Sequence, residues 1–256
     1  MTVEKLPLAG RVAVVIGGTG GIGAPVCLRL AGAGASIIVG YRRDASVART
    51  LASALPPSLD GSRHSAFQVD VTNPEALQRF AYEIDSRYGR VDVLVNSAGT
   101  TKFVPHDDLD SLNDQLIDEI FRTNWRGPFA TIRALKPLLV KTGDALVVNI
   151  SSIAAVSGVG SNVAYCASKA ALNAMTLSLA RALAPAVRVV SVSPGVVETQ
   201  FIKALDQSWL KEQERRTPLG RLASPEEVAD AVLAVATSLR YSTGCIIPVD
   251  GGRPLS

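Results

Sequence analysis

A tyrosine and a lysine four residues apart offer acid–base chemistry in the segment Tyr165-Cys166-Ala167-Ser168-Lys169. Side chains at positions i and i+4 share one face of a helix. A phenol ionises near pH ~10 and transfers protons poorly at neutral pH, but a neighbouring ammonium group favours the phenolate. We therefore expect Lys169 to lower the pKa of Tyr165, so that the pair serves as a general acid or base near physiological pH.

A serine upstream makes the pattern a more specific sign of a catalytic site, since Tyr-x-x-x-Lys alone also occurs in surface helices. Ser152 follows the apolar run Ala145-Leu146-Val147-Val148-Asn149, which is typical of a buried strand. It precedes Tyr165 by thirteen residues, and a loop of small residues from Ala154 to Ser161 lies between them. A hydroxyl at the end of a strand and a helix-borne Tyr/Lys pair can then converge on one substrate oxygen.

A glycine-rich turn near the start of the chain has the setting of a dinucleotide-binding loop. Residues 11–16 predict a strand buried on both faces, and a helical pattern covers residues 24–33. Between them stands Gly17-Gly18-Thr19-Gly20-Gly21-Ile22-Gly23. Glycines let the backbone approach a pyrophosphate, and the helix N-terminus offers free N–H groups. A turn that binds nothing is the alternative, but the strand and the helix around it favour cofactor binding.

Together these motifs resemble the short-chain dehydrogenase/reductase family, and within it the 3-oxoacyl-[acyl-carrier-protein] reductases. The resemblance extends over residues 11–252, and the residues that carry it are Ser152, Tyr165, Lys169, Gly17, Gly21 and Gly23, the last three in the pattern G-x-x-x-G-x-G. It implies one α/β domain over residues 1–256, with a doubly wound Rossmann-type fold and a seven-stranded parallel sheet flanked by helices. It also implies a substrate lid over about residues 200–216, where the sequence pattern is polar and irregular, and a homotetramer.

Strand and helix patterns alternate along the chain, which favours one domain. Strands are predicted over residues 11–16, 36–40, 66–69, 91–95, 145–149 and 187–192, with a last strand within 244–252. Helices are predicted over residues 24–33, 45–55, 72–88, 111–139, 163–183 and 225–238. We expect the site at the carboxyl ends of the strands, near the switch in strand order, and we expect the helices over 111–139 and 163–183 to build part of the tetramer.

The resemblance implies catalytic roles for Asn124, Ser152, Tyr165 and Lys169. During reduction of a ketone, Tyr165 protonates the developing alkoxide, Ser152 donates a hydrogen bond to the same oxygen, and Lys169 also anchors the cofactor ribose. The family has an asparagine at the position of Asn124, and its backbone carbonyl holds a water linked to the lysine. A buried helical asparagine with a packing role is the alternative.

The resemblance also implies a set of cofactor-binding residues that follow successive strands. They are Gly17, Thr19, Gly20, Gly21, Ile22, Gly23, Tyr41, Arg42, Arg43, Asp70, Val71, Asn96, Ala98, Gly99, Tyr165, Lys169, Pro194, Gly195, Val197 and Thr199. The chain departs from the family pattern at Ile16, where a threonine is usual, and at Ser97, which replaces an asparagine. The structural alternatives are a helix cap at Asp70 and a sheet-stabilising turn at Asn96.

The residues after the second strand favour NADP(H) over NAD(H). An acidic residue there would bind the ribose hydroxyls of NAD, but Tyr41 occupies the position and is followed by Arg42 and Arg43. A guanidinium group binds a 2′-phosphate through charge-assisted hydrogen bonds, and Thr19 can add another. Asp44 partly offsets this positive charge, and a solvated basic turn that leaves NAD(H) usable is the alternative.

Composition excludes several other classes. The 256 residues are 47% hydrophobic and 19% charged, with a net charge of +3, and show no basic stripe that would indicate nucleic-acid binding. No apolar run approaches the ~18 residues of a membrane span, and the first ten residues lack a signal-peptide core. The three cysteines and two histidines indicate neither a disulfide framework nor a metal site. We expect a cytoplasmic protein without a metal.

The expected reaction is hydride transfer between a nicotinamide and a ketone or secondary-alcohol carbon. The expected partner is a small-molecule or acyl-thioester carbonyl substrate, 3-oxoacyl-like in the first place, with a sugar, polyol or small alcohol as the alternative. A non-catalytic dinucleotide-sensing protein is the rival from another class, but it would have lost the Tyr, Lys or Ser, and all three are present. An epimerase of the extended branch would need a different glycine motif.

Overall fold

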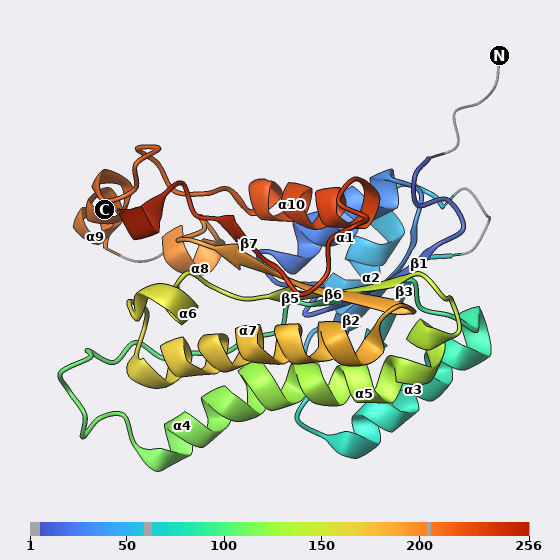
Figure 1. Cartoon of the computed structure of the whole chain (residues 1–256), viewed down its shortest axis with the longest axis horizontal. Coiled ribbons are helices and arrows are strands. Elements are labelled where there is room, and N and C mark those ends of the chain that lie inside the picture. The colour runs from blue at the N-terminus through green and yellow to red at the C-terminus, as the bar shows by residue number, and fades with distance from the viewer. Residues whose placement is uncertain (1–5, 59–62, 204–205, 256) are drawn as a thin grey trace.

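One parallel sheet of seven strands forms the centre of the computed structural model, which describes residues 6–58, 63–203 and 206–255 (Figure 1). Its strand order is β3-β2-β1-β4-β5-β6-β7. The strands are β1 (Val12–Ile16), β2 (Ser36–Tyr41), β3 (Ser65–Gln68), β4 (Val93–Asn96), β5 (Ala145–Ile150), β6 (Val187–Pro194) and β7 (Ile246–Val249). The predicted fold class is therefore confirmed.

Alternating side chains divide the core between the two faces of the sheet. Val15 and Ile37 pack on one face with Leu30, whereas Val14 and Ile38 pack on the other with Leu135. Successive residues of a strand point to opposite faces, so a central parallel strand must be apolar throughout. This explains why the runs that form β1 and β5 contain hardly any polar residue and are fully buried.

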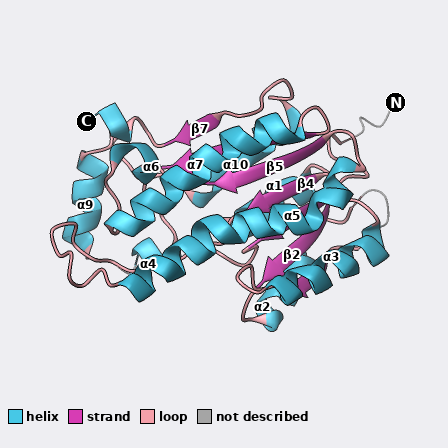
Figure 2. Ribbon diagram, turned by 60° about the horizontal axis from the view of Figure 1, so that its bottom comes forward, coloured by secondary structure: helices cyan, strands magenta, loops and turns pink. Residues whose placement is uncertain are grey.

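Helices cover both faces, as Figure 1 shows. One face carries α1 (Gly23–Gly32), α2 (Ala45–Ala54) and α10 (Pro225–Thr237). The other carries α3 (Pro74–Tyr88), α4 (Asp114–Phe121), α5 (Gly127–Val140) and α7 (Val163–Leu183), and Figure 2 shows α7, α5 and α3 laid across it. The short helices α6 (Ala154–Ser157), α8 (Gln200–Lys203) and α9 (Gln207–Arg215) lie beyond the carboxyl ends of the strands.

The switch in strand order falls between β1 and β4, which lie side by side although two strands separate them in sequence. The connections from β1 run outward in one direction and those from β4 in the other. Loops after β1 and β4 therefore diverge and leave a crevice at their carboxyl ends, where ligands bind in such folds. The register sets Ile16 level with Asn96, so the glycine turn and the turn after β4 start side by side.

The predicted helix over 111–139 is interrupted in the structure. Helix α4 ends at Phe121, a π-helical turn η1 (Arg122–Arg126) follows, and α5 begins at Gly127. Within η1, the Asn124 side chain bonds to the backbone of Thr100, 24 residues away in sequence. This tertiary contact is absent from the local sequence pattern, and π turns often mark functional positions.

The region predicted as an irregular lid is mostly helical. Helices α8 and α9 occupy it, and the side chain of Asp206 caps α9 by accepting from the backbone N–H groups of Ser208 and Trp209. Residues 204 and 205 of the predicted lid lie outside the described residues, as do residues 1–5, 59–62 and 256 of the predicted single domain. The short helix α6 likewise occupies part of the predicted loop 154–161.

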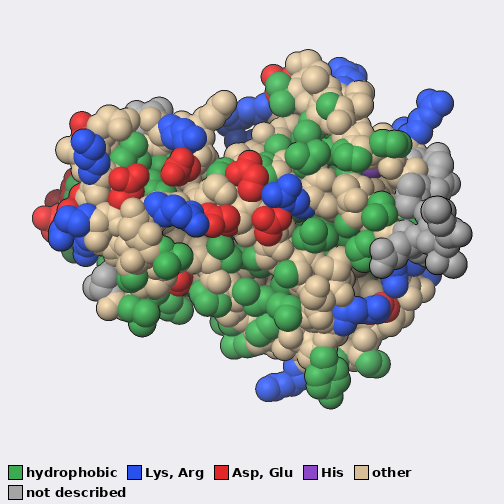
Figure 3. Space-filling model, turned by 90° about the horizontal axis from the view of Figure 1, so that it is seen from above, with side chains coloured by type: hydrophobic (Ala, Val, Ile, Leu, Met, Phe, Trp, Pro, Cys, Tyr) green, Lys and Arg blue, Asp and Glu red, His purple; other side chains and the backbone are tan. Residues whose placement is uncertain are grey.

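Charges of both signs are mixed over the face above α10 and α1. Figure 3 shows acidic and basic side chains next to one another across this face. Two of the ion pairs here are Arg29–Asp230 and Arg221–Glu227. Among the described residues, no helix combines the length and the apolar character needed to cross a membrane.

Candidate active site

The glycine turn after β1 is shaped so that side chains are excluded from it. Gly17 has a φ of +72°, and a Cβ at this position would lie 2.9 Å from the backbone nitrogen of Ala98. A Cβ at Gly21 would lie 2.8 Å from Cγ2 of Thr199, and one at Gly23 would lie 2.1 Å from the carbonyl oxygen of Gly17. The turn thus packs closely against the loops after β4 and β6, and forms a backbone cradle at the N-terminus of α1.

The basic residues after β2 lie open to solvent. Arg42 and Arg43 are exposed and Tyr41 is half-buried. Asp44, predicted to offset their charge, accepts hydrogen bonds from the backbone of Ser46 and Val47 and thereby caps α2. A hydrogen bond from the Ser46 hydroxyl, together with these backbone bonds, lowers the pKa of the Asp44 carboxyl, so its charge is held at the helix N-terminus.

Asp70 lies after β3, close enough to Arg42 to be influenced by its charge. Burial raises the pKa of the Asp70 carboxyl, but hydrogen bonds from the backbone and hydroxyl of Thr72, together with the charge of Arg42, outweigh burial and lower the pKa below its usual value. The alternative interpretation of Asp70 as a helix cap is wrong, because Asn73 caps α3. Val71 is buried in the core.

A buried polar row crosses the sheet below the turn that follows β4. Asn96 donates to the side-chain oxygen of Asn149 over 2.9 Å, and Asn149 donates to Thr176 of α7 over 2.9 Å. This row supports the sheet-stabilising interpretation of Asn96. The Oδ1 atom of Asn96 is buried and has no hydrogen-bond partner among the described residues. An unsatisfied buried acceptor at the head of the crevice fits a site whose ligand supplies the missing donor.

Lys169 and Ser152 are buried at the carboxyl end of β5, with Tyr165 half-buried beside them. The Nζ atom of Lys169 donates to the carbonyl of Ile150 over 2.8 Å and lies 5.8 Å from the centre of the Tyr165 ring. The hydroxyl of Ser152 accepts from the backbone N–H of Ala154 over 3.1 Å. The structure therefore brings the three predicted residues together.

The expected direction of the Tyr165 pKa shift is wrong. Burial raises the pKa of the Tyr165 phenol, while the hydrogen bond with Ser152 acts in the opposite direction without overcoming it. Burial also lowers the pKa of Lys169 to about 8. The low-dielectric surroundings disfavour both charged forms, and this effect exceeds the attraction that the i, i+4 spacing suggested.

Asn124 lies in η1 with its side chain turned to the loop after β4. Its Oδ1 accepts from the backbone N–H of Thr100 over 2.8 Å, and its Nδ2 donates to the Thr100 carbonyl and to Ser168 Oγ. A Cβ on Gly99 would lie 3.5 Å from Asn124 Oδ1 and 3.9 Å from Lys169 Nζ. Asn124 thus joins η1, the Gly99 turn and α7, which is the packing role that the alternative interpretation proposed.

The loop after β6 closes the remaining side of the site. Pro194 ends β6, the Gly195 N–H donates to Val249 of β7, and Val197 is buried. Thr199 packs against Gly21, so this loop contacts the glycine turn. Two further residues of the site, Thr100 and Asn162, were not predicted. The only sequence signal for Asn162 was a capping residue three positions before Tyr165.

Comparison with known proteins decides the family. The family model described as enoyl-(acyl carrier protein) reductase matches residues 17–253. A protein assigned as ketoacyl reductase 2 of the granaticin polyketide synthase of Streptomyces violaceoruber is 38% identical, over 95% of this chain and 96% of its own. The 3-oxoacyl-[acyl-carrier-protein] reductase FabG of Thermotoga maritima is 32% identical, over 96% and 98% of the two chains.

The chain belongs to the short-chain dehydrogenase/reductase family. A solved structure from Brucella melitensis, described as a short-chain dehydrogenase/reductase and glucose/ribitol dehydrogenase, has the same fold. It superposes with a TM-score of 0.88 at 29% identity, covering 98% of this chain and 99% of that one. As a member of this family, the protein is an oxidoreductase that acts on CH–OH groups and their carbonyl counterparts.

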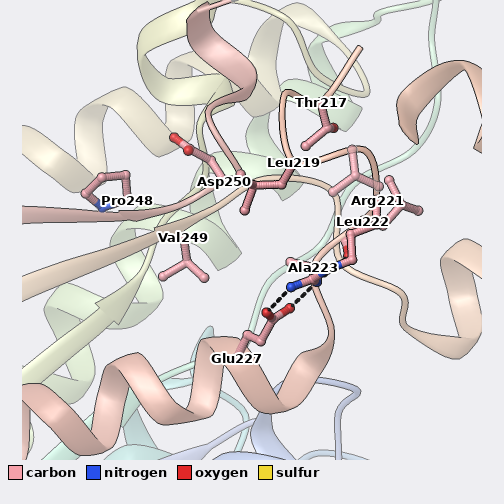
Figure 4. Close-up of a pocket in the computed structure, with 11 residues that line it drawn as sticks. Thr217, Leu219, Arg221, Leu222, Ala223, Glu227, Pro248, Val249 and Asp250 are labelled. Carbon is pink, nitrogen blue, oxygen red and sulfur yellow. Dashed lines mark hydrogen bonds and ion pairs between the residues drawn. The ribbon is translucent and has the colours of Figure 1, made fainter. Parts of the chain in front are cut away.

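A separate cavity of this dehydrogenase/reductase lies where β6 and β7 end (Figure 4). Its volume is about 240 Å³, and its lining includes Val196, Leu219, Asp250 and the ion pair of Arg221 with Glu227. Figure 4 shows the two hydrogen bonds of that pair, which together with the Ser224 backbone lower the pKa of Glu227 to about 2. None of the predicted catalytic residues lines this cavity.

Substitution of Lys169 by Met is expected to remove a pH-dependent part of the stability of this dehydrogenase/reductase. Between pH ~8 and ~10.4 the unfolded chain retains a proton that folded Lys169 has lost, so the free energy of unfolding rises with pH in this window. Relative to Lys169→Met, the unmodified protein should gain roughly 2–4 kcal/mol across it. Denaturant unfolding of both proteins between pH ~7 and ~9.5 measures the difference.

Taking the difference between the two proteins cancels other buried groups, such as Cys27, whose pKa is raised by burial to about 12. Lys136→Met, on the exposed side of α5, is the control for loss of a lysine as such. A stability difference between the Lys169 variant and the unmodified protein that stays constant over this pH range would contradict the burial argument.

Proposed function

We propose that this protein is an NADP(H)-dependent carbonyl reductase that converts a 3-oxoacyl-like ketone to the secondary alcohol. The observation that carries the proposal is the meeting of Ser152, Tyr165 and Lys169 at the carboxyl end of β5, beside the glycine cradle. The Tyr/Lys pair is held on α7, and Lys169 is fixed by the carbonyl of the strand that carries the serine.

The cradle fits a dinucleotide. Gly17, Gly21 and Gly23 leave no room for side chains, and the N-terminus of α1 that follows them offers backbone N–H groups that can bind a pyrophosphate. The unsatisfied, buried Oδ1 of Asn96 lies at the carboxyl end of β4, level with Ile16 of β1. We assign the adenosine end to Arg42 and Asp70 and the nicotinamide end to Pro194, Gly195, Val197 and Thr199. When bound there, the nicotinamide supplies or accepts the hydride.

The protein residues then control one proton and one developing charge. Because burial raises the pKa of Tyr165, its phenol is protonated at neutral pH and suits proton donation to the carbonyl oxygen during reduction. Ser152 donates a hydrogen bond to the same oxygen, where negative charge builds up. Lys169 is charged below pH ~8 and stabilises the phenolate left behind. Asn124 holds the Gly99–Thr100 turn and maintains the path by which Tyr165 regains its proton.

The rim of the site favours an apolar acyl chain over a sugar. Phe103 is exposed on the loop after β4, and Val156 of α6 and Val159 just after it are exposed before the start of α7. Trp209 of α9 packs edge-to-face on Phe103, with ring centres 6.3 Å apart, so α9 reaches over to the loop after β4. A sugar or polyol would need hydrogen-bonding side chains at these positions, whereas apolar groups bury an alkyl chain. We assign α8 and α9 as the substrate lid.

A substrate panel tests this function. 3-Oxoacyl thioesters, small ketones, sugars and polyols are offered with NADPH or NADP, and turnover is followed by nicotinamide absorbance. The 3-oxoacyl thioesters should be reduced with the highest kcat/KM. Polyol oxidation without thioester reduction would establish the alternative dehydrogenase, and cofactor binding without any turnover would support a dinucleotide sensor. We further propose a cytoplasmic location and a homotetramer. The homotetramer is supported by half-buried and exposed apolar residues on η1, α5 and α7, namely Trp125, Phe129 and Leu177, and light scattering measures its mass.

Arg42→Ala is expected to remove most of the preference for NADP. Arg42 is exposed at the end of β2, its carbonyl is held by Gln68, and no carboxylate stands at Tyr41 to repel a 2′-phosphate. Loss of one charge-assisted contact of about 1.5–3 kcal/mol should raise the NADP Michaelis constant roughly 10- to 100-fold, with little effect on the NAD constant. Arg49→Ala, on the exposed side of α2, removes the same charge and is the matched control. An unchanged NADP/NAD ratio would mean that the basic turn is only solvated.

A further inference from the structure

Asn162, a fully buried asparagine at the start of α7, bonds to both the catalytic helix and the loop after β4. We propose that it is a positioning residue, which fixes the backbone of Tyr165 to the loop segment 100–104 and so sets the distance between the phenol and the substrate carbonyl. The inference rests on the proposed reductase function, in which Tyr165 is the proton donor.

On the helix side, Asn162 caps α7 at the residue that carries the chemistry. Its Oδ1 accepts from the backbone N–H of Tyr165 over 2.7 Å. This N–H is one of those that a helix leaves unpaired in its first turn, and an asparagine is among the best residues to accept from it. The position of the Tyr165 backbone thus follows the position of the Asn162 side chain.

On the loop side, the same amide donates both of its hydrogens. Nδ2 of Asn162 donates to the Lys102 carbonyl over 2.7 Å and to the Thr101 hydroxyl over 3.2 Å. The neighbouring Ser161 adds two bonds, since its hydroxyl pairs with that of Thr101 and its carbonyl accepts from Val104 N–H. A buried amide whose donors and acceptor are all used resists displacement, because each broken bond leaves a buried polar group unsatisfied.

Asn124 holds the adjacent residue of this segment from the opposite side. It bonds to both the N–H and the carbonyl of Thr100 and also to Ser168 Oγ, which in turn donates to the Tyr165 carbonyl. The segment 100–102 is therefore held between two asparagines that are both connected to the Tyr165 backbone. A cap alone does not require this arrangement: Asn113 caps α4 through the same type of bond, and its side chain is exposed.

The test separates the cap from the loop contacts. Asn162→Ser retains an oxygen that accepts from Tyr165 N–H, but its shorter side chain loses the donors to Lys102 and Thr101. Asn162→Ala loses both functions, and Asn113→Ala loses a cap at another helix. Thermal unfolding, kcat and KM on the substrate panel, cofactor affinity by nicotinamide fluorescence, and backbone hydrogen exchange over 100–104 are measured for each protein.

Asn162→Ser should unfold at a temperature between those of Asn162→Ala and the unmodified protein, because it keeps the cap and loses the loop contacts. It should lower kcat roughly 10- to 100-fold through misplacement of the phenol, with the cofactor affinity unchanged. Hydrogen exchange over 100–104 should accelerate in Asn162→Ser and not in Asn113→Ala. Full kcat together with unchanged exchange in Asn162→Ser would reduce Asn162 to a helix cap and overturn the proposal. If the unmodified protein turns over no substrate, the proposed function fails, and the exchange data alone decide whether Asn162 holds the loop.

Discussion

Tyr165→Phe is expected to lower kcat by roughly 10²- to 10⁴-fold while cofactor binding stays nearly unchanged. The substitution removes one hydroxyl and leaves the ring, the helix cap at Asn162 and the buried Lys169 in place. Ser152 donates a hydrogen bond in the proposed reaction, but an aliphatic hydroxyl does not replace a phenol as the proton source. Steady-state kinetics with the best substrate of the panel and a fluorescence titration with NADPH measure the two effects.

Tyr88→Phe is the matched control for loss of the hydroxyl of a half-buried tyrosine. Its hydroxyl donates to the carbonyl of Arg63 over 2.7 Å, at the end of α3 remote from the carboxyl edge of the sheet. This variant should lose stability without losing kcat. A Tyr165→Phe protein that turns over at a rate similar to the Tyr88→Phe protein would exclude Tyr165 as the proton donor.

The fold was predictable because a central strand that is buried on both faces appears in the sequence as a nearly unbroken apolar run. Every residue from Val12 to Ile16 and from Ala145 to Ile150 is buried, so the apolar runs in the sequence coincide with β1 and β5. The ends of other strands were predicted less closely, since the central strand β4 begins at Val93, two residues later than predicted. β3 begins one residue earlier than predicted, at Ser65, whose hydroxyl pairs with Tyr88, and its residues are only partly buried.

The site was predictable in its composition and less so in its electrostatics. The spacing of Tyr165 and Lys169 placed both on one helix face, but the sign of the Tyr165 pKa shift depends on burial by chain segments distant in sequence. The π turn at Asn124 depends on Thr100 in the same way, and so do the loop contacts of Asn162. Local patterns record which face of an element is buried. They do not record which distant backbone group a polar side chain will bind.

The glycine cradle gives a second prediction with a large effect. Gly23→Ala would place a Cβ 2.1 Å from the carbonyl oxygen of Gly17, a contact that no rotamer can relieve because both partners are fixed by the backbone. Either the turn or the start of α1 must move, and a displacement costing 3 kcal/mol or so would weaken NADP(H) binding roughly 100-fold or more. Fluorescence titration with NADPH, and the rise in unfolding temperature that saturating cofactor produces, both measure this loss.

Gly32→Ala in the same helix is the control, because a Cβ at Gly32 would meet no described residue outside its own helical turn within 4 Å. Alanine is preferred over glycine within a helix, so this variant should be more stable by about 0.5–1 kcal/mol and bind cofactor normally. The two variants add the same methyl group at opposite ends of α1. Only the methyl group at Gly23 would clash with the glycine cradle. If Gly23→Ala folds and binds NADPH with unchanged affinity, the pyrophosphate does not lie on this turn, and the cofactor assignment built on Gly17, Gly21 and Gly23 must be abandoned.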